Sequence, residues 1–443
     1  MGSGTSLDCC ELTDIGRRRA SNQDSKVVLA PWSVEQYRRR GWLFVVADGM
    51  GAHAAGEMAS ALAVEHVPIV YEKLAARSPP RALDAALRQA HAVIHERGEN
   101  AADLKGMGTT CTALALVPRG ALVGHVGDSR AYRVRGGRID QLSRDHSLSW
   151  ELEGQRTAGV DEPIPKNIIT RSLGPQPRVD VDVEGPFPVD TGDVFVLCSD
   201  GLSGQVADEE IGLLAGGLSP DAAAAALVGL TLVRGAPDNV TVIVARAGKK
   251  EASQVAPGDP PWPLTDETAT KKPQPLPVKL LAGAAASLLT ALVFNPWSGL
   301  MVNDGVVGGL LGPDLAFPLA LILSVTMALL FIGCLLAAVL FVFAPSTGPV
   351  RVLLPGAKLG GGPYRTYDCA ASAPLLEGIV SSVESAAHGL STRERDQLLA
   401  AVSAARSQIT AGEFPAAITA AADAIAAYRR LIDAARGDDT AHG

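Results

Sequence analysis

Four aspartates stand where expected apolar strands end or begin, each with small or polar residues beside it. They are Asp48, Asp128, Asp200 and Asp238. A single aspartate of this kind is weak support for a site, because Asp and Gly are common in ordinary turns. Four with the same surroundings predict a shared carboxylate cluster, and such a cluster is tolerable only when cations offset its charge. Hard oxygen ligands beside glycines favour Mg²⁺ or Mn²⁺ over zinc, and the sequence has no competing histidine–cysteine set.

The first of these acids belongs to the stretch LFVVADGMGAHAAGEMAS, residues 43–60. Residues 43–47 have the composition of a buried strand, and Asp48-Gly49 follows at its end. Helical periodicity begins near Gly56. A carboxylate at the end of a strand, followed by glycines that let the backbone come close, suits a cation or phosphate site.

Three arginines, Arg17, Arg18 and Arg19, precede the polar cluster of residues 20–24. One interpretation is a solvated basic run. The other is an anion-binding site, because a guanidinium group binds phosphate in bidentate fashion. The residues alone leave both interpretations open.

The elements that must position these residues alternate between strand and helix periodicity. Strands are predicted at residues 26–30, 43–47, 109–117, 121–126, 131–134, 193–199 and 240–245. Helices are predicted at residues 56–74, 80–96 and 207–233. This mixture indicates an α+β domain.

An ordered set of short motifs carries a resemblance to a known family. The motifs are RxxNQD, VVADGMG, GTT, VGDSR, SDGL and DNVTVIV. They resemble those of the metal-dependent serine/threonine protein phosphatases of the PP2C type (PPM family), in the bacterial form, over about residues 8–247. The resemblance implies a PP2C-like α-β-β-α sandwich of two antiparallel sheets flanked by helices, with metals in a cleft at one end of the sheets.

The resemblance also implies metal ligands, two and possibly three Mn²⁺ or Mg²⁺ ions in all. Asp48 matches the acid that bridges two metals, and Gly49 matches the residue whose carbonyl ligates one of them. Asp200 and Asp238 match the other carboxylates of the second metal, and Asp128 with Asp200 matches a third site of bacterial members.

The remaining roles concern the phosphate and the water. Arg19 matches the phosphate-binding arginine, and Asp24 is expected to act through metal-bound water. A water bridging the two metals is implied to attack phosphorus in line, so no phosphoenzyme is needed. Met50 stands where eukaryotic relatives carry a histidine proposed as general acid, which leaves that acid unassigned. For His53, close by, a structural role or a role behind the metal ligands is expected rather than that of the general acid. Residues 143–174 resemble the flap that tunes substrate choice, and residues 151–165 look shorter than in many bacterial relatives.

Composition bounds the class of protein. The net charge of −8 gives no support for nucleic-acid binding. Only 19% of residues are charged and the mean hydropathy is +0.18, which indicates a membrane segment. Residues 1–14 lack the apolar core of a signal peptide and the chain has no CxxC motif, so we expect a reduced, cytoplasmic setting for the N-terminal part.

Four regions are predicted: a phosphatase domain (1–247), a Pro/Lys-rich linker (248–277), two transmembrane helices (278–344) and a cytoplasmic linker with a helical C-terminal region (345–443). The uncharged run 315–343 is long enough to cross a bilayer, whereas 280–294 is short enough that a buried or re-entrant helix stays an alternative. The loop at about 295–314 has no basic residue, while lysines and arginines flank the pair of runs. The positive-inside rule therefore predicts two spans with both termini in the cytoplasm.

The tail from about residue 374 to 436 is alanine-rich and helical in period, with two or three helices expected. Ser391 with Glu394 predicts a helix start, and residues 412–415 predict a break before a last helix. The sequence leaves open whether the tail is an interaction hairpin, a dimerising element or a cap against the membrane surface.

These observations predict a membrane-anchored enzyme that hydrolyses phosphoserine and phosphothreonine in proteins, with a cognate Ser/Thr kinase and its substrates as partners. The alternative is a catalytically silent signalling or binding module that kept the fold, and the retained acids and Arg19 speak against it. A further hypothesis, compatible with the first, makes the hairpin and tail a sensor whose output is phosphatase activity.

Overall fold

The computed structural model describes residues 7–51, 55–153, 168–265, 278–293, 295, 312–343 and 351–441. Residues 154–167 of the expected flap, His53, residues 266–277 of the linker and most of the loop between the apolar helices lie outside the described residues. The chain divides into two compact units. One combines Met1–Leu264 with Val352–Gly443, and the other is Thr265–Arg351.

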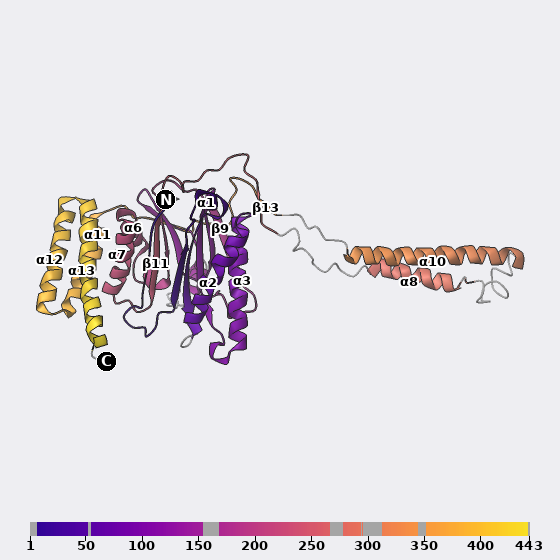
Figure 1. Ribbon diagram of the computed structural model, residues 1–443, viewed down its shortest axis with the longest axis horizontal. Coiled ribbons are helices and arrows are strands. Elements are labelled where there is room, and N and C mark those ends of the chain that lie inside the picture. Colours follow the sequence, from indigo (N-terminus) through magenta and orange to yellow (C-terminus); the bar gives the residue numbers. More distant parts are fainter. Residues whose placement is uncertain are drawn as a thin grey trace. The chain divides into compact units, whose positions relative to one another are not determined.

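The first unit contains two antiparallel sheets (Figure 1). One sheet has the order β1 (Asp8–Asp14), β11 (Val240–Arg246), β10 (Val194–Cys198), β7 (Arg130–Arg135), β8 (Arg138–Gln141) and β14 (Arg365–Asp368). The other has the order β2 (Asp24–Leu29), β3 (Trp42–Met50), β5 (Cys111–Val117), β6 (Gly120–Val126) and β9 (Asp182–Phe187), with β4 (Gly108–Thr109) paired to β3. Phe44 and Leu114 of one sheet and Phe195 and Ile243 of the other are fully buried in a common core between them.

Helices cover the outer face of each sheet. α2 (Ala55–Leu74) and α3 (Pro79–Asn100) lie over the sheet that contains β3, as Figure 1 shows. α2 buries Ala59, Ala63, Val67 and Tyr71 at intervals of four, which is the spacing of one helix face. α6 (Asp208–Gly217) and α7 (Pro220–Val233) cover the sheet that contains β10. The predicted α-β-β-α sandwich is confirmed.

The shorter elements complete this domain. They are α1 (Val34–Arg40), η1 (Ala102–Leu104), α4 (Leu148–Glu153) and α5 (Asp200–Ser203). Three details differ from the sequence prediction. β1 forms in a stretch where no element was predicted. The expected strand 109–117 is interrupted at Thr110. The expected helix 207–233 is two helices, because Ser219 caps a new helix whose first residue is Pro220.

The C-terminal tail belongs to the same compact unit as the sandwich. It forms α11 (Ala373–Ala386), η3 (Ala387–Gly389), α12 (Thr392–Ala411) and α13 (Phe414–Ala441), whose apolar side chains share one core with α6 and α7. β14 adds the edge strand next to β8. The compact unit therefore extends beyond the boundary at residue 247 that the sequence suggests.

Two predictions about the tail are confirmed. Ser391 and Glu394 form a capping box at the start of α12. Gly412 ends that helix in the left-handed conformation, with φ of 76°.

The second unit consists of α8 (Val278–Val293) and α10 (Pro313–Phe343). The helices are antiparallel, because Ser324 Oγ donates to the Ala291 carbonyl at 3.1 Å while Gly283 faces Cys334. Within the described part of the chain, only Asp314–Ala338 is long and apolar enough to cross a membrane. α8 is shorter, so the predicted span at residues 280–294 has weaker support than the one at residues 315–343.

Both ends of this insertion return to one point of the first unit. β12 (Trp262–Pro263), which precedes the insertion, pairs antiparallel with β13 (Val352–Leu353), which follows it. Trp262 and Leu353 are buried against α3 and its neighbours. The apolar hairpin is thus inserted into the compact unit and does not separate two independent domains.

Candidate active site

Two of the predicted site acids face each other across a pair of strands. Asp24 opens β2 and Asp48 lies near the end of β3, and the two are direct partners in the antiparallel register. Side chains of such partners stand on the same face of the sheet, about 5 Å apart at Cβ. Two like charges at this spacing are destabilising unless a proton or a cation offsets them.

The other three acids come from the second sheet or from the turn that connects the two sheets. Asp128 sits in the turn between β6 and β7, Asp200 begins α5 directly after β10, and Asp238 precedes β11. Strands from both sheets therefore deliver acids to one end of the sandwich. The predicted set converges because each acid occupies the end of a strand.

Burial and mutual repulsion shift the ionisation of this cluster. Burial, followed by the neighbouring charges of Asp24, Asp200 and Asp128, raises the pKa of Asp48 well above its usual range. Burial and the charge of Asp200 raise the pKa of Asp128 to about 7. Burial raises the pKa of Asp24 to about 7, although a hydrogen bond from Ser199 Oγ at 2.7 Å acts in the opposite sense.

Two features of the cluster fit a divalent cation. The Oδ1 atoms of Asp24 and Asp128 are buried with no hydrogen-bond partner in the described part of the chain. The absence of a side chain at Gly49 lets neighbouring backbone pack closely against it, since a Cβ there would lie 2.1 Å from the Gly56 carbonyl oxygen and 2.6 Å from that of Gln23. Carboxylate oxygens together with a backbone carbonyl are the hard oxygen donors that Mg²⁺ and Mn²⁺ prefer.

The cluster is not a finished ligand set. Within the described ranges, no three acidic, histidine or cysteine side chains already have the arrangement of one ion's ligands. Asp238 is engaged elsewhere, because its Oδ2 accepts a hydrogen bond from Arg19 Nη2 at 2.6 Å. The charge of Asp48 and Asp200 also acts on Arg19, whose pKa is raised, chiefly by the hydrogen bond to Asp238. Arg19 therefore lies at the edge of the cluster, and its side chain is half exposed.

The Asn239 side chain and a close backbone contact at Gly16 hold the segment that carries Arg19 against the loop of Asp238. Asn239 Oδ1 accepts a hydrogen bond from the Gln23 amide, and its Nδ2 donates to the carbonyls of Ile15 and Ser21. Gly16, with φ of 78°, lies so close to the Asp238 carbonyl that a Cβ would be 2.1 Å from it. The RxxNQD motif near the start of the predicted domain and the DNVTVIV motif near its end are therefore joined by direct contacts.

Side chains without a predicted role support the acids. Thr110 Oγ1 accepts from the Asp48 amide at 2.9 Å and contacts Ser129 Oγ at 2.7 Å. Thr109 Oγ1 donates to the Asp48 carbonyl at 2.9 Å. Ser199 Oγ links Asp24 to the Thr241 amide. In the sequence, these contacts are indicated only by the threonines and serines next to the motifs. The contacts themselves form because strands that are distant in sequence pair with each other.

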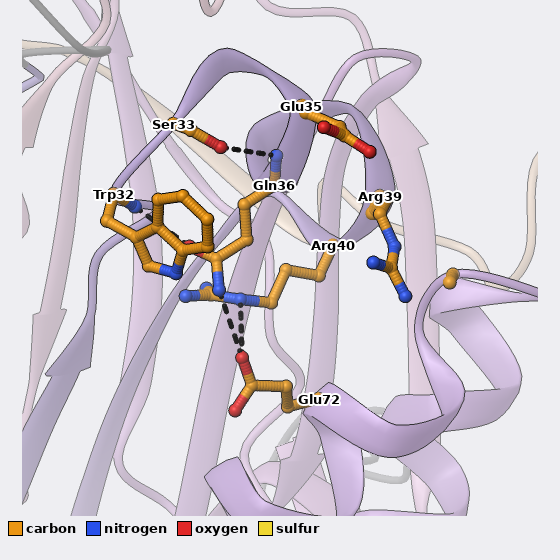
Figure 2. A pocket seen from close by; sticks show the side chains of 8 residues that line it. Trp32, Ser33, Glu35, Gln36, Arg39, Arg40 and Glu72 are labelled. Carbon is orange, nitrogen blue, oxygen red and sulfur yellow. Dashed lines mark hydrogen bonds and ion pairs between the residues drawn. The ribbon is translucent and has the colours of Figure 1, made fainter. Parts of the chain in front are cut away.

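A separate hollow of about 260 Å³ beside α1 is not part of this site (Figure 2). It lies at the opposite ends of β3 and α2 from Asp48 and Gly56, because Arg40 precedes β3 and Glu72 is near the end of α2. The Arg40 guanidinium donates to the carbonyls of Leu29, Ala30 and Gly41, and its Nε lies 3.2 Å from Glu72. The Arg40 guanidinium is thus held by backbone carbonyls and by one ion pair within the protein, which favours a structural role for the hollow.

Comparison with known proteins agrees with the motifs. The family model of protein phosphatase 2C matches residues 17–226. The phosphatase PhpP of Streptococcus pneumoniae is 36% identical over 208 residues, which cover 45% of this chain and 80% of PhpP. The serine/threonine protein phosphatase PstP of Mycobacterium tuberculosis is 35% identical over 253 residues, or 55% of this chain and 46% of PstP.

Solved structures of similar proteins cover the same part of the chain. The M. tuberculosis phosphatase PstP/Ppp is 35% identical with a TM-score of 0.48, covering 55% of this chain and 99% of that one. The catalytic domain of PstP in complex with two manganese ions is 34% identical with a TM-score of 0.47, again covering 55% and 99%. By its motifs and by its identity to PhpP, the chain belongs to the protein phosphatase 2C family of enzymes.

Proposed function

We propose that this protein is a membrane-anchored, metal-dependent phosphatase that hydrolyses phosphoserine and phosphothreonine in proteins. The observation that carries the proposal is the convergence of Asp24, Asp48, Asp128 and Asp200 at one end of the sandwich, with Arg19 at the edge. The names of PhpP and PstP support the reaction class. A bacterial Ser/Thr kinase and its substrates are the proposed partners.

The residues that would hold the ions are Asp48, the Gly49 carbonyl, Asp200, Asp238 and Asp128. Two or three Mn²⁺ or Mg²⁺ ions bound there would supply a nucleophile at neutral pH and offset the charge of the phosphoryl group. Asp24, buried opposite Asp48, would hold a proton or an ordered water beside that carboxylate.

Arg19 would bind the phosphoryl oxygens of the substrate. Its guanidinium is half exposed and already close to the acids, so it can reach both a substrate in solution and the cluster. A planar fork of donors orients a phosphoryl group and offsets the charge that develops during in-line displacement. Met50 has no proton to donate, so protonation of the leaving alkoxide falls to another group.

We further propose that α8 and α10 both cross the membrane. The pairing of β12 with β13 supports an even number of crossings, because the segments before and after residues 265–351 must then lie on the same side of the membrane. α10 is long enough to span, and α8 with 16 residues covers about 24 Å of a core of about 30 Å. The flanking lysines and arginines favour a cytoplasmic phosphatase unit and C-terminus.

The topology is tested by labelling intact cells with a membrane-impermeant maleimide. Asn303→Cys, in the loop between the helices, is expected to be labelled from outside. Arg430→Cys, in the tail, is expected to be labelled only after lysis. Labelling of Asn303→Cys that also requires lysis would contradict the proposed crossings.

The activity is tested on the full chain in detergent, since side chains of the tail between Tyr367 and Ile432 share a core with the sandwich. Phosphothreonine and phosphotyrosine peptides are compared in Mn²⁺ and in EDTA. The proposal predicts release of phosphate from the phosphothreonine peptide in Mn²⁺ alone. A folded, Mn²⁺-binding protein without turnover on either peptide would favour the catalytically silent module.

A further inference from the structure

The last helix of the tail contacts the segment that carries Arg19. Tyr428 of α13 accepts a hydrogen bond through its hydroxyl from Arg17 Nη1 at 3.2 Å. The next residue, Arg429, lies with its Nη2 4.0 Å from Asp14 Oδ2. These contacts join residues more than 400 positions apart, and they fall two and five positions before Arg19.

α13 is firmly seated where it makes these contacts. Ile425, one turn before Tyr428, fills the space above Gly229 of α7, where a Cβ would lie 2.4 Å from Ile425 Cγ2. Ile418 occupies the equivalent space above Gly217 of α6. Tyr428 itself is 3% exposed, so packing around its ring fixes the position of its hydroxyl. Residues three apart share a helix face, which places Tyr428 in line with Ile425.

The contacted segment is in turn rigidly joined to the site. Asp14 Oδ1 accepts from the Gly16 amide at 2.9 Å, and the Arg17 amide donates to the Ala236 carbonyl at 2.9 Å. Gly16 lies directly against the Asp238 carbonyl. Residues 14–17 therefore set the path of the backbone from which Arg19 reaches Asp238.

We propose that Tyr428 and Arg429 are positioning residues for Arg19, so that the C-terminal tail is a working part of the phosphate-binding site. This inference rests on the proposed role of Arg19. The sandwich fixes one side of the segment through Ala236 and Asp238. The tail fixes the other side through Arg17 and Asp14, and a displacement of the guanidinium by about 1 Å is enough to cost activity.

The test uses the full chain in detergent with two point variants that keep the packing of α13. Tyr428→Phe removes only the hydroxyl, and Arg429→Gln removes the charge and shortens the side chain, which ends the ion pairs of Arg429 with Asp14 and with Asp433. Arg430→Gln is the matched control, because Arg430 is the adjacent, exposed arginine of the same helix. Measured quantities are kcat and KM for a phosphothreonine peptide and the inhibition constant of inorganic phosphate.

The expected result is a three- to tenfold loss of kcat/KM, roughly, in the double variant Tyr428→Phe/Arg429→Gln, with KM and the phosphate inhibition constant both raised. Arg430→Gln is expected to match the parent. In an Arg19→Ala background, the two tail substitutions should cost nothing further, because the group that they position is gone.

Either of two results would overturn the inference. One is a parent-like KM and phosphate inhibition constant in the double variant, whatever happens to kcat, since loss of folded enzyme lowers turnover without changing phosphate affinity. The other is an equal loss with and without Arg19. Failure of the proposed function is distinguishable, since the parent itself would then show no turnover in Mn²⁺. Failure of the proposed role of Arg19 would leave Arg19→Ala with the parent's kcat/KM.

Discussion

Arg19 and Asp238 form an ion pair of 2.6 Å at the edge of the carboxylate cluster, and both side chains are partly exposed, by 50% and 34%. An exposed pair of this kind contributes only about 0–1 kcal/mol to stability. Its significance lies in function, because Asp238 is a proposed metal ligand and Arg19 the proposed phosphate ligand. The ion pair holds Asp238 beside the proposed metal site and Arg19 beside the proposed phosphate site.

Arg19→Ala should therefore separate activity from stability and from metal binding. We expect a loss of about 10²-fold in kcat/KM for a phosphothreonine peptide, since one oriented donor to the transition state is removed. Mn²⁺ affinity, measured by calorimetry, should stay or rise, because a cation next to Asp238 is lost. Arg18→Ala, the exposed neighbour, is the control and should match the parent. Weaker Mn²⁺ binding in Arg19→Ala would contradict this assignment.

Gly49 is the position where the backbone should tolerate no side chain. A Cβ would lie 2.1 Å from the Gly56 carbonyl oxygen, so Gly49→Ala must displace the start of α2. We expect a loss of about 1–3 kcal/mol in the free energy of unfolding together with the loss of turnover. Gly258→Ala, where nothing lies within 4 Å, should change neither. A Gly49→Ala protein with parent stability would show that the close approach is not real.

The docking of the tail on α7 can be tested by replacing two helical glycines, Gly229 and Gly378, with alanine. Gly229→Ala places a Cβ 2.4 Å from Ile425 and should lower the thermal unfolding midpoint, at a cost of about 1–3 kcal/mol. Gly378→Ala in α11 meets nothing within 4 Å and should stabilise by about 0.5–1 kcal/mol through helix propensity. If Gly229→Ala were as stable as Gly378→Ala, the tail would not be docked on α7.

The acid cluster predicts an unusual dependence of stability on pH in the metal-free protein. The pKa values of Asp24 and Asp128 are about 7 in the folded state, against about 4 in an unfolded chain. The folded protein then binds more protons, so these groups stabilise it fully below pH 4 and lose that contribution as the pH rises through 7. Between pH 5 and pH 8, the unfolding midpoint in EDTA should fall.

Mn²⁺ should remove this dependence, because the ion binds the ionised carboxylates and takes the place of the protons. Thermal unfolding at several pH values, with EDTA and with Mn²⁺, makes the comparison. Asp128→Asn should flatten the EDTA profile in part. A stability that rises with pH in EDTA would contradict the raised pKa values.

The sequence predicted the site better than it predicted the surroundings of the site. Asp48, Asp128, Asp200 and Asp238 could be picked out because an acid beside small or polar residues at the end or the start of a strand is a local pattern. The pairing of Asp24 with Asp48 also follows from local strands, once β2 and β3 are neighbours. The middle of the flap, residues 154–167, by contrast lies outside the described residues, so the role of the flap stays a prediction.

Contacts between distant segments could not be predicted in this way. β14 joins the sheet more than 200 residues after β8, and its four residues have no strong strand pattern. The seating of Ile425 above Gly229 depends on a missing side chain in another helix, which periodicity does not reveal. The sequence therefore left the tail with several possible roles, whereas the structure unites it with the catalytic unit.

The measurement that tests the central claim most directly is Mn²⁺-dependent turnover of the full chain beside Asp48→Asn. The protein is stripped with EDTA, and hydrolysis of a phosphothreonine peptide is followed as Mn²⁺ is added back. We predict no turnover in EDTA, recovery with Mn²⁺, and a loss of more than about 10²-fold in Asp48→Asn at every Mn²⁺ concentration. Turnover that survives in EDTA, or an Asp48→Asn protein that works like the parent, would contradict the account.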